Sequence, residues 1–317
     1  MNNQSGLHTA ATSQPKVSIG MPVYNGEIFI REAIDSVLAQ TFTDFELVIS
    51  DNASLDDTQA ICLEYAGKDS RIRYLRQPDN IGAQKNFTFV VDESVGQYFS
   101  WLAHDDVLDE GFLSICVGVL ENSPEIVLVS GDFLTVDGNG RELGLKELTD
   151  IRITVPWPKR ISAFYRYPIS NAFLCIYGLM RRDALIKVLS CARRGPLLTG
   201  NELPILSRFA AIGEVASLPL ILRKYRYHEG SSFHAEKATL SSSAIRGSLA
   251  RQYNYIWHRL DQLFVLTQSS YPWRFKVYVG YRVLCFYVTH YKRRLIRFVC
   301  RAREKRTDSN YIKNGNK

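Results

Sequence analysis

The sequence VSIGMPVYNGEIFIREAIDSVLAQTFTDFELVISDNASLDDT, residues 17–58, alternates apolar runs with short polar segments. Its apolar run Val17–Met21 predicts a strand, the helical spacing of Ile28–Leu38 predicts a helix, and Phe45–Ile49 predicts a second strand. Each strand runs directly into polar, turn-forming residues, PVYNG after the first and SDNASLDDT after the second. A strand, a helix and a strand in this order are typical of a βαβ unit with two parallel strands.

The same alternation continues to residue 129. Strands that alternate with helices of this length form a mostly parallel sheet flanked by helices. Ligands of such sheets bind at the carboxyl ends of the strands, so the candidate functional residues are those that directly follow each strand. Further strands are expected at Ile72–Leu75, Tyr98–Leu102 and Ile126–Val129, and further helices at Thr58–Tyr65, Ala83–Val91 and Phe112–Leu120.

Beyond residue 137 the pattern is less regular. Residues 138–168 contain no clear element, and a stretch of this length inside a compact domain is usually a lid or a binding loop. We expect a strand at Asn171–Met180, a helix at Glu202–Ala211 and a strand at Leu220–Tyr227. The remainder of the chain is helical in pattern.

The composition is that of an ordinary globular protein. Of the 317 residues, 46% are apolar and 22% are charged, which excludes a disordered chain, a collagen and a coiled coil. No uninterrupted apolar run approaches the ~20 residues of a membrane span, and the polar start predicts no secretory signal. The six cysteines lie far apart without a C-x-x-C pair, which argues against a disulfide framework or a zinc site and favours a reducing cytoplasm.

Positive charge is concentrated near the end of the chain. The net charge is +7, and Arg274–Arg306 holds eleven Lys and Arg residues against the single Glu304, so the rest of the chain is net negative. The same segment carries many apolar and aromatic residues, a composition typical of a helix that lies on an anionic membrane surface. A helix packed on the rest of the protein, with a solvated basic face, is the alternative. No nucleic-acid-binding motif accompanies the charge, so no nucleic-acid partner is expected.

Polar residues follow the second and third predicted strands. Asp51 stands at a strand end, where a carboxylate can accept a hydrogen bond from an N–H of a nucleobase; a plain turn residue is the alternative. Ser54, with Asp57 three residues later, resembles a capping box, so Ser54 is expected to have a structural role at a helix start. Asn80 and Gly82 mark a helix start whose free N–H groups can bind a ligand, or else an ordinary capped helix.

Two adjacent carboxylates, Asp105 and Asp106, follow the fourth predicted strand, after Ala103 and His104. Neighbouring carboxylates repel one another unless a cation or strong donors lie between them. Divalent cations such as Mg²⁺ and Mn²⁺ bind carboxylate oxygens and keep positions open for phosphate. The pair therefore indicates a metal–diphosphate site, with a cap at the start of the next helix as the alternative.

In this order and spacing the segments resemble the inverting family-two glycosyltransferases, of the bacterial type that builds polysaccharides. The resemblance rests on residues 17–58 together with RYLRQPDNIGAQKNF and WLAHDD; it is close over Lys16–Val136 and extends more loosely to about His228. It implies an α/β chain with the GT-A nucleotide-diphospho-sugar transferase fold and a C-terminal helical extension. The implied organisation is a disordered leader at 1–15, a GT-A domain at 16–236, a basic helical extension at 237–306 and a disordered tail at 307–317.

The resemblance also implies roles for individual residues. Asp105 corresponds to the metal-binding carboxylate of the family's D-x-D element, whose usual first Asp is Ala103 in this chain. At the end of the last strand, His228 is expected to bind the metal with Asp105, and Arg226 to contact an anion. Glu202 corresponds to the family's general base, a role in which a carboxylate takes the proton of an acceptor hydroxyl. The residues expected to bind the nucleotide-sugar are Pro22, Tyr24, Glu27, Asp51, Asn52, Arg76, Gly82, Lys85, His104 and Asp105.

The implied function is the inverting transfer of a sugar from a nucleotide-diphospho-sugar, a UDP-sugar, to an acceptor hydroxyl in the synthesis of a cell-surface polysaccharide or glycolipid. The cofactor would be a divalent metal, Mn²⁺ or Mg²⁺, and the acceptor a saccharide or lipid-linked saccharide. Peripheral membrane contact through the basic helix would place the protein in the cytoplasm, at the inner face of the cytoplasmic membrane. Two alternatives stay open. One is an inactive sugar-nucleotide-binding scaffold, in view of Ala103; the other is a nucleotidyltransferase, although the first strand lacks the Gly-rich basic loop usual for that class.

Overall fold

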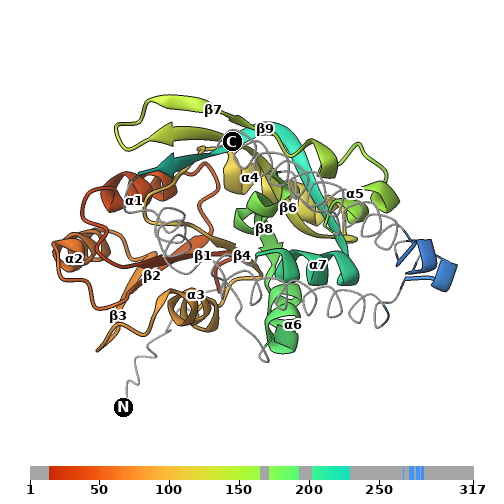
Figure 1. Cartoon of the computed structure of the whole chain (residues 1–317). Coiled ribbons are helices and arrows are strands. Elements are labelled where there is room, and N and C mark those ends of the chain that lie inside the picture. Colours follow the sequence, from red (N-terminus) through yellow and green to blue (C-terminus); the bar gives the residue numbers. More distant parts are fainter. Residues whose placement is uncertain are drawn as a thin grey trace, which may run out of the picture.

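The computed structural model describes residues 14–164, 171–192 and 202–228, together with 267, 271–274, 276–278, 280 and 281. The described part contains one nine-stranded sheet with helices on both faces (Figure 1). The strands are β1 (Val17–Val23), β2 (Phe45–Asp51), β3 (Ile72–Arg76), β4 (Tyr98–Trp101), β5 (Val107–Leu108), β6 (Ile126–Asp137), β7 (Glu142–Lys146), β8 (Leu179–Arg181) and β9 (Glu214–Tyr227). The helices are α1 (Ile30–Leu38), α2 (Thr58–Lys68), α3 (Ala83–Asp92), α4 (Phe112–Asn122), α5 (Trp157–Ala163), α6 (Arg182–Ala192) and α7 (Glu202–Ile212), with 3-10 helices η1 (Thr149–Ile151) and η2 (Asn171–Tyr177).

The strand order of the sheet is β3-β2-β1-β4-β8-β6-β9-β5, with β7 paired to β6. The first four strands in this order are parallel, and β6 is parallel to β9, whereas β8 is antiparallel to both β4 and β6. This confirms the prediction of a mixed, mostly parallel sheet flanked by helices. In the register Val23 lies beside Asp51 and Asp51 beside Arg76, so three strand ends meet at one edge of the sheet.

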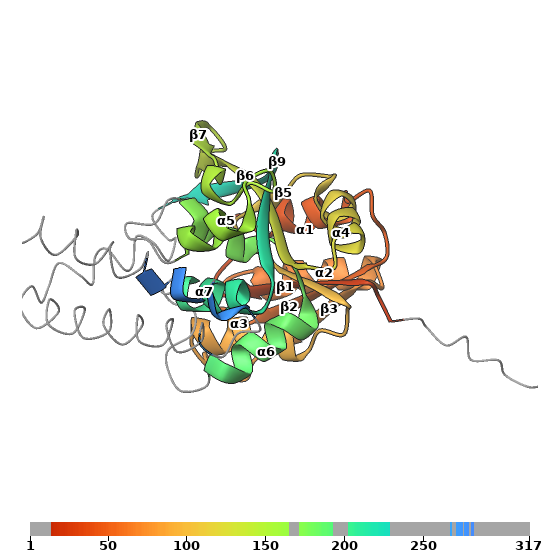
Figure 2. The ribbon, with the colours of Figure 1, turned by 90° about the vertical axis from the view of Figure 1, so that its right-hand side faces the viewer.

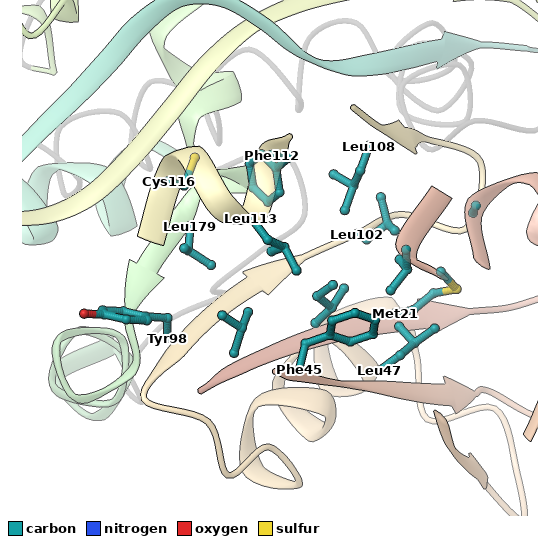
Figure 3. Close-up of a cluster of buried hydrophobic side chains, with 14 of the residues drawn as sticks. Met21, Phe45, Leu47, Tyr98, Leu102, Leu108, Phe112, Leu113, Cys116 and Leu179 are labelled. Atoms are coloured by element: carbon teal, nitrogen blue, oxygen red, sulfur yellow. The ribbon is translucent and has the colours of Figure 1, made fainter. Parts of the chain in front are cut away.

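Two hydrophobic cores fill the two sides of the sheet. On one side α1, α2 and α4 pack on the strands through buried residues such as Ile34, Cys62 and Leu113. Figure 3 shows part of this core, with Leu113 and Cys116 of α4 near Leu179 of β8. On the other side α3, α5, α6 and α7 pack through residues such as Val90 and Phe209. Figure 2 shows α1 and α4 on one side of β1 and β2, and α3 and α6 on the other. Because apolar surface is buried on both faces, the strand ends are held in fixed positions.

The segment Asn171–Met180, predicted as a strand, is mainly a 3-10 helix. Residues Asn171–Tyr177 form η2, and only Leu179–Arg181 form the strand β8. A short apolar run fits a buried helical turn as well as a buried strand, so the sequence pattern does not decide between them. The chain changes direction at Gly178, where a Cβ atom would lie 2.3 Å from the carbonyl oxygen of Val129.

The stretch 138–168, expected to be irregular, contains β7, η1 and α5 in its described part. Arg152 ties this stretch to the sheet, because its guanidinium donates to the Asp132 carboxylate and to the carbonyl oxygen of Leu218. The Arg152 and Asp132 side chains are both largely buried. The stretch is therefore an ordered layer beside β6 and β9, and its elements were missed because each is short.

Several predicted segments lie outside the described residues. These are the leader up to residue 13, the tail 307–317 and most of the extension 237–306. The domain boundaries therefore stay predictions. No helix in the described part of the chain has the length and hydropathy needed to cross a membrane.

Gly178→Ala should lower the free energy of unfolding by about 1–3 kcal/mol, the usual cost of forcing an extra methyl group into a well-packed site. The added methyl group would collide with the backbone of β6, which cannot move aside as a flexible side chain can. Urea unfolding measures the effect. Gly118→Ala in α4 is the control, because a Cβ atom there meets nothing within 4 Å and alanine favours a helix. Equal stability of the two variants would contradict the assigned role of Gly178.

Candidate functional site

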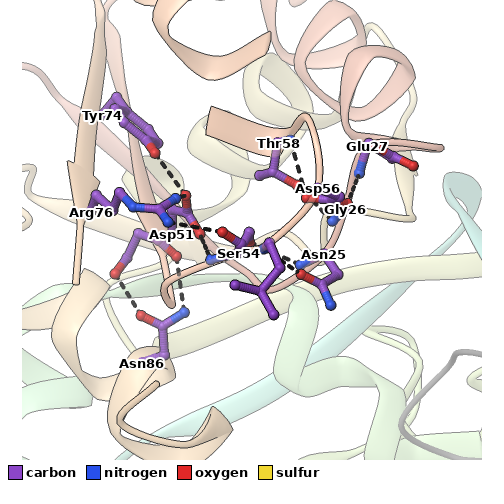
Figure 4. A network of polar contacts seen from close by, with 12 residues as sticks. Asn25, Gly26, Glu27, Asp51, Ser54, Asp56, Thr58, Tyr74, Arg76 and Asn86 are labelled. Atoms are coloured by element: carbon purple, nitrogen blue, oxygen red, sulfur yellow. Dashed lines mark hydrogen bonds and ion pairs between the residues drawn. The ribbon is translucent and has the colours of Figure 1, made fainter. Parts of the chain in front are cut away.

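The loops that follow β1 and β2 are joined by reciprocal hydrogen bonds (Figure 4). The Asn25 N–H donates to Ser54 Oγ at 2.9 Å. The Glu27 N–H donates to the Asp56 carboxylate at 3.0 Å, and the Asp57 N–H donates to the Glu27 carboxylate at 2.9 Å. Glu27, expected to bind the nucleotide, therefore also holds the two loops together as one unit.

The prediction that Ser54 caps a helix is wrong. Helix α2 begins at Thr58 with Asp57 in the N-cap position, and Ser54 Oγ accepts the N–H of Asn25 instead. The capping bond comes from Asp56, whose carboxylate accepts the Thr58 N–H at 3.1 Å. Burial would raise the pKa of Asp56, but its hydrogen bonds from Thr58 and from backbone N–H groups hold the pKa below its usual value.

Strand β1 continues through Pro22 to Val23, two residues beyond its predicted end. The pairing of β1 with β4 stops at Gly20, so the missing N–H of Pro22 removes no ladder bond on that side. The chain turns at Asn25, whose φ of 52° lies in the left-handed region that Asn tolerates. Pro22 is buried and shapes the strand end, whereas Tyr24 is exposed beside the turn and accessible to a ligand.

Asp51 ends β2 and is completely buried. One carboxylate oxygen accepts the Ser54 N–H at 2.8 Å, and the other accepts the Tyr74 hydroxyl at 2.7 Å and Arg76 Nη1 at 2.6 Å. The Arg76 side chain is 31% exposed, so it is the member of the Asp51–Arg76 pair that a ligand can reach. The structure thus brings two predicted site residues together. Tyr74 was not predicted, because a tyrosine within a half-buried strand carries no functional signal.

Asn52 ties the loop after β2 to the start of α3. Its amide donates to Asn80 Oδ1 at 2.9 Å, and its side-chain oxygen accepts the Ile81 N–H at 2.8 Å. The Gly82 N–H also donates to Asn80, and the φ of 84° at Gly82 suits glycine at this turn. Two N–H groups at this helix start are therefore bonded within the protein, while Lys85 is exposed in the first turn of α3.

His104 lies against the loop that follows β1. A Cβ atom at Gly26 would lie 2.7 Å from the His104 ring and 2.6 Å from the Val23 side chain, so only glycine leaves room for the ring. The Gly26 N–H in turn donates to Thr58 Oγ1 at 2.8 Å. Burial lowers the pKa of His104, which keeps its imidazole neutral at neutral pH.

The two residues predicted to bind a metal lie side by side, although they are 123 positions apart in the sequence. His228 Nε2 lies 2.9 Å from Asp105 Oδ2, and the His228 ring packs on Phe29 with ring centroids 4.8 Å apart. Burial alone would raise the pKa of Asp105, but the hydrogen bond from His228 and the neighbouring His104 lower it below its usual value. Asp105 is therefore an ionised carboxylate beside an imidazole. Over the described residues, no cluster of three or more His, Cys, Asp and Glu side chains is arranged to hold a metal ion by itself.

Arg226, expected to contact a ligand anion, is bonded within the protein. Its buried guanidinium donates to the Glu32 carboxylate at 2.5 Å and to the Asp105 carbonyl oxygen at 2.9 Å, and it lies 4.7 Å from the centroid of the Phe29 ring. Arg226 thereby links β9 to α1 and to the Asp105 segment. Glu32 was not predicted, because in the sequence it is an ordinary acidic residue in the first turn of a helix.

A second arginine of β9, Arg223, lies near Asp106. The two residues are 2% and 1% exposed, and Arg223 Nη1 lies 3.8 Å from Asp106 Oδ2. Burial and the neighbouring Asp105 raise the pKa of Asp106, while the positive charge of Arg223 opposes this shift. Arg223 and Lys224 are two adjacent basic residues, and the sequence pattern does not show which of them faces inward. In the structure Arg223 is buried and Lys224 is exposed.

Glu202 is the first residue of α7, at the helix start where it was predicted. Its side chain and residues 193–201 lie outside the described residues. Its role as a general base therefore stays a prediction.

Known proteins resemble parts of this chain in sequence, and solved structures resemble it in fold. An uncharacterized glycosyltransferase of Rickettsia bellii is 37% identical over 136 residues, which cover 42% of this chain and 19% of that protein. The GalNAc(5)-diNAcBac-PP-undecaprenol beta-1,3-glucosyltransferase of Campylobacter jejuni is 35% identical over 101 residues, which cover 32% of this chain and 33% of that protein. The chain thus matches about a fifth of the length of the first relative and a third of the second.

The crystal structure of S. aureus TarS in complex with UDP-GlcNAc has the same fold, with a TM-score of 0.61 and 17% sequence identity. The superposition covers 87% of this chain and 73% of that one. The family model for glycosyl transferase family 2 matches residues 18–189, more than half of the chain. With its GT-A sheet and this match, the chain belongs to glycosyl transferase family 2.

Proposed function

We propose that this chain is an inverting glycosyltransferase that moves a sugar from a UDP-sugar to a hydroxyl of a saccharide or lipid-linked saccharide. The observation that carries the proposal is the pairing of Asp105 with His228, in a chain of glycosyl transferase family 2. The pair lies next to the joined loops after β1 and β2, because the preceding residue His104 packs on Gly26. Sheets of this kind bind their ligands at the carboxyl ends of the parallel strands. The product would enter a cell-surface polysaccharide or glycolipid.

The donor atoms at this place fit a divalent cation. Asp105 supplies an ionised carboxylate and His228 an imidazole nitrogen; Mn²⁺ accepts this mixture more readily than Mg²⁺ does. Asp105 and His228 would hold the ion, with oxygens of the donor diphosphate as its further ligands. When bound, the ion offsets the negative charge that develops on the departing diphosphate.

The nucleotide would lie along the loops after β1, β2 and β3. Arg76 is held by the buried Asp51 carboxylate and presents its guanidinium toward solvent, where it can meet the base or a phosphate. The UDP-GlcNAc bound to TarS supports a UDP-sugar as the donor.

Glu202, at the start of α7, is the proposed general base. Its carboxylate would take the proton of the acceptor hydroxyl while the acceptor oxygen forms a bond to the anomeric carbon. In the same step the bond between that carbon and the phosphate oxygen breaks, and UDP leaves with the electron pair. Attack from the face opposite the leaving group inverts the configuration at the anomeric carbon.

The products distinguish the proposal from its two alternatives. A glycosyltransferase releases UDP from a UDP-sugar and transfers the sugar, measured with Mn²⁺ and a panel of saccharide and lipid-linked acceptors. An inactive scaffold binds the UDP-sugar without turnover. A nucleotidyltransferase joins UTP and a sugar phosphate to form a UDP-sugar, and it releases pyrophosphate.

Asp51→Asn should weaken UDP binding about tenfold or more, because the amide cannot hold Arg76 as the carboxylate does. A hydrogen bond to a charged group contributes about 1.5–3 kcal/mol. Isothermal titration calorimetry with UDP and Mn²⁺ measures the change. Asp69→Asn is the matched control, since it removes the carboxylate partner of Arg71 at the start of β3 and should bind UDP as the wild type does. If the wild type, Asp51→Asn and Asp69→Asn bind UDP with equal affinity, the assignment of Asp51 to the nucleotide site is wrong.

Glu202→Gln should bind the donor as the wild type does. Its rate of sugar transfer should fall by a factor of about 10²–10⁴, the usual contribution of a positioned base. The amide keeps the size of the side chain but cannot accept the proton. Glu142→Gln on the exposed strand β7 is the control and should transfer normally. Release of UDP in the presence of acceptor measures the rate. Transfer at the wild-type rate by Glu202→Gln would assign the base to another residue.

Membrane contact is proposed for the segment that begins at Tyr271. The Trp157 indole N–H donates to the Tyr271 hydroxyl at 3.0 Å, and this hydroxyl donates to the Gly213 carbonyl oxygen at 3.3 Å. These bonds fasten the segment to α5 and to the turn before β9. The described residues within 273–281 are helical, and three exposed apolar or aromatic residues recur there every four positions: Trp273, Val277 and Tyr281.

Residues four apart lie on one face of a helix, so this exposed face suits the interface of a membrane. The eleven basic residues of Arg274–Arg306 favour an anionic lipid surface. The name of the Campylobacter relative contains undecaprenol, which supports a lipid-linked acceptor at that surface. We therefore propose that the protein acts in the cytoplasm, at the inner face of the cytoplasmic membrane.

Trp273→Glu should reduce sedimentation of the protein with anionic vesicles at low salt, and deletion of residues 273–317 should abolish it. A carboxylate on this face is repelled by the anionic headgroups. Each basic residue that no longer contacts the membrane lowers the binding free energy by about 1 kcal/mol. Leu143→Glu is the control, because Leu143 is an exposed apolar residue on β7, away from this segment. A wild-type protein that stays in the supernatant would refute membrane docking and favour a soluble acceptor.

A further inference from the structure

Arg223 connects the end of β4 with the end of η2. Its Nη2 donates to the carbonyl oxygen of Trp101, at the end of β4, at 2.9 Å, and to that of Tyr177, at the end of η2, at 2.7 Å. The guanidinium also lies 5.7 Å from the Phe112 ring centroid and 5.4 Å from that of Tyr177. Arg223 therefore holds the strand end from which the Asp105 segment departs.

The charge of Arg223 is only partly satisfied. Within the described part of the chain, its Nε and Nη1 have no hydrogen-bond partner, and neither does Oδ2 of Asp106. Nη1 and Oδ2 lie 3.8 Å apart, close enough for charge attraction but too far for a hydrogen bond. Burying a charge without a partner of opposite sign is costly, so each of these two side chains keeps the other in the interior.

Asp106 and Asp105 face different partners. Asp106 Oδ1 accepts the backbone N–H of Arg226 at 3.1 Å, and the Asp105 carbonyl oxygen accepts Arg226 Nε at 2.9 Å. The Asp105 carboxylate is then directed to His228. Asp106 thus lies in the interior beside Arg223, while the Asp105 carboxylate is left to face His228 in the site.

We propose that Arg223 and Asp106 are positioning residues, which hold the backbone of the Asp105 segment so that the Asp105 carboxylate faces His228. The proposal rests on the proposed function insofar as Asp105 and His228 are the pair assigned to the metal. Arg223 and Asp106 are both buried, so neither side chain is exposed to a ligand. They act through the position of Asp105.

The test compares Arg223→Met and Asp106→Asn with the control Arg160→Met. Arg160 is likewise a buried arginine: it donates to the Val215 carbonyl oxygen at 3.0 Å, forms an ion pair with Glu214, and has an unpartnered Nε. Its loss should therefore cost stability in a similar way, but far from Asp105. Thermal unfolding measures that cost for each variant.

Two measurements report the position of Asp105. The imidazole ¹H–¹⁵N signals of His228, assigned with His228→Gln, report its contact with Asp105 without any ligand. Calorimetric UDP affinity, measured with EDTA and with Mn²⁺, separates nucleotide contacts from the contribution of the metal. We expect Arg223→Met and Asp106→Asn to shift the His228 signals and to weaken the Mn²⁺-dependent part of UDP affinity about 10–100-fold, as loss of supporting partners does at metal sites. Affinity in EDTA should stay within about twofold, and Arg160→Met should change neither measurement.

Unchanged His228 signals and an unchanged Mn²⁺ effect in Asp106→Asn would overturn the proposal, and so would equal changes in Arg160→Met. If Arg223→Met does not fold, Asp106→Asn decides, because it keeps the shape of the side chain and its Oδ1 acceptor. A wild-type protein that binds no nucleotide would refute the proposed function instead. In that case the His228 signals still decide whether Arg223 and Asp106 position Asp105.

Discussion

The register of the parallel strands β1, β2 and β3 is the constraint on which the candidate site depends. It sets Val23 beside Asp51 and Asp51 beside Arg76, so that the loops after these three strands begin side by side at the same edge of the sheet. A shift of one residue would turn the Asp51 side chain to the opposite face of the sheet. The hydrophobic cores on both faces resist such a shift, because Leu47 and Val48 would exchange faces and each would lose its present packing partners.

Loops that begin side by side at one edge of the sheet can form hydrogen bonds with each other instead of with water. The side chains of Asn25 and Glu27 accept backbone N–H groups of the loop after β2, and the Asn52 side chain accepts one at the start of α3. These side chains satisfy backbone N–H groups that would otherwise need solvent, which fixes the edge before a ligand arrives. A preorganised edge of this kind spends less binding free energy on ordering loops when a nucleotide binds.

The second half of the chain completes the site through β9. This strand brings Arg223, Arg226 and His228 to the Asp105–Asp106 segment, with Arg226 also bonded to Glu32 of α1. Buried charges of this kind contribute little net stability, because desolvation offsets their attraction. They restrict β9 and the Asp105–Asp106 segment to a single relative arrangement, because any other arrangement would leave a buried charge without its partner.

Most of the fold and part of the site could be predicted from the sequence. Apart from the two-residue strand β5, which was not predicted, the strands and helices up to residue 129 follow from their hydrophobic periodicity. The strand-end positions of Asp51 and Asp105 follow from the βαβ order. The prediction failed at η2, where a short apolar run has no distinctive period, and for the role of Ser54, where Asp56 supplies the cap instead. Such choices depend on neighbours that are distant in the sequence.

The sequence by itself determined the alternation of strands and helices, because periodicity is a local property, and it determined the types of residue at each strand end. Only the tertiary structure decided that Arg76 covers Asp51, that Gly26 leaves room for His104, and that His228 meets Asp105 across 123 positions. It also decided that Arg223 faces the interior while Lys224 faces outward. These contacts depend on which strands become neighbours, and that follows from the burial of apolar surface over the whole sheet.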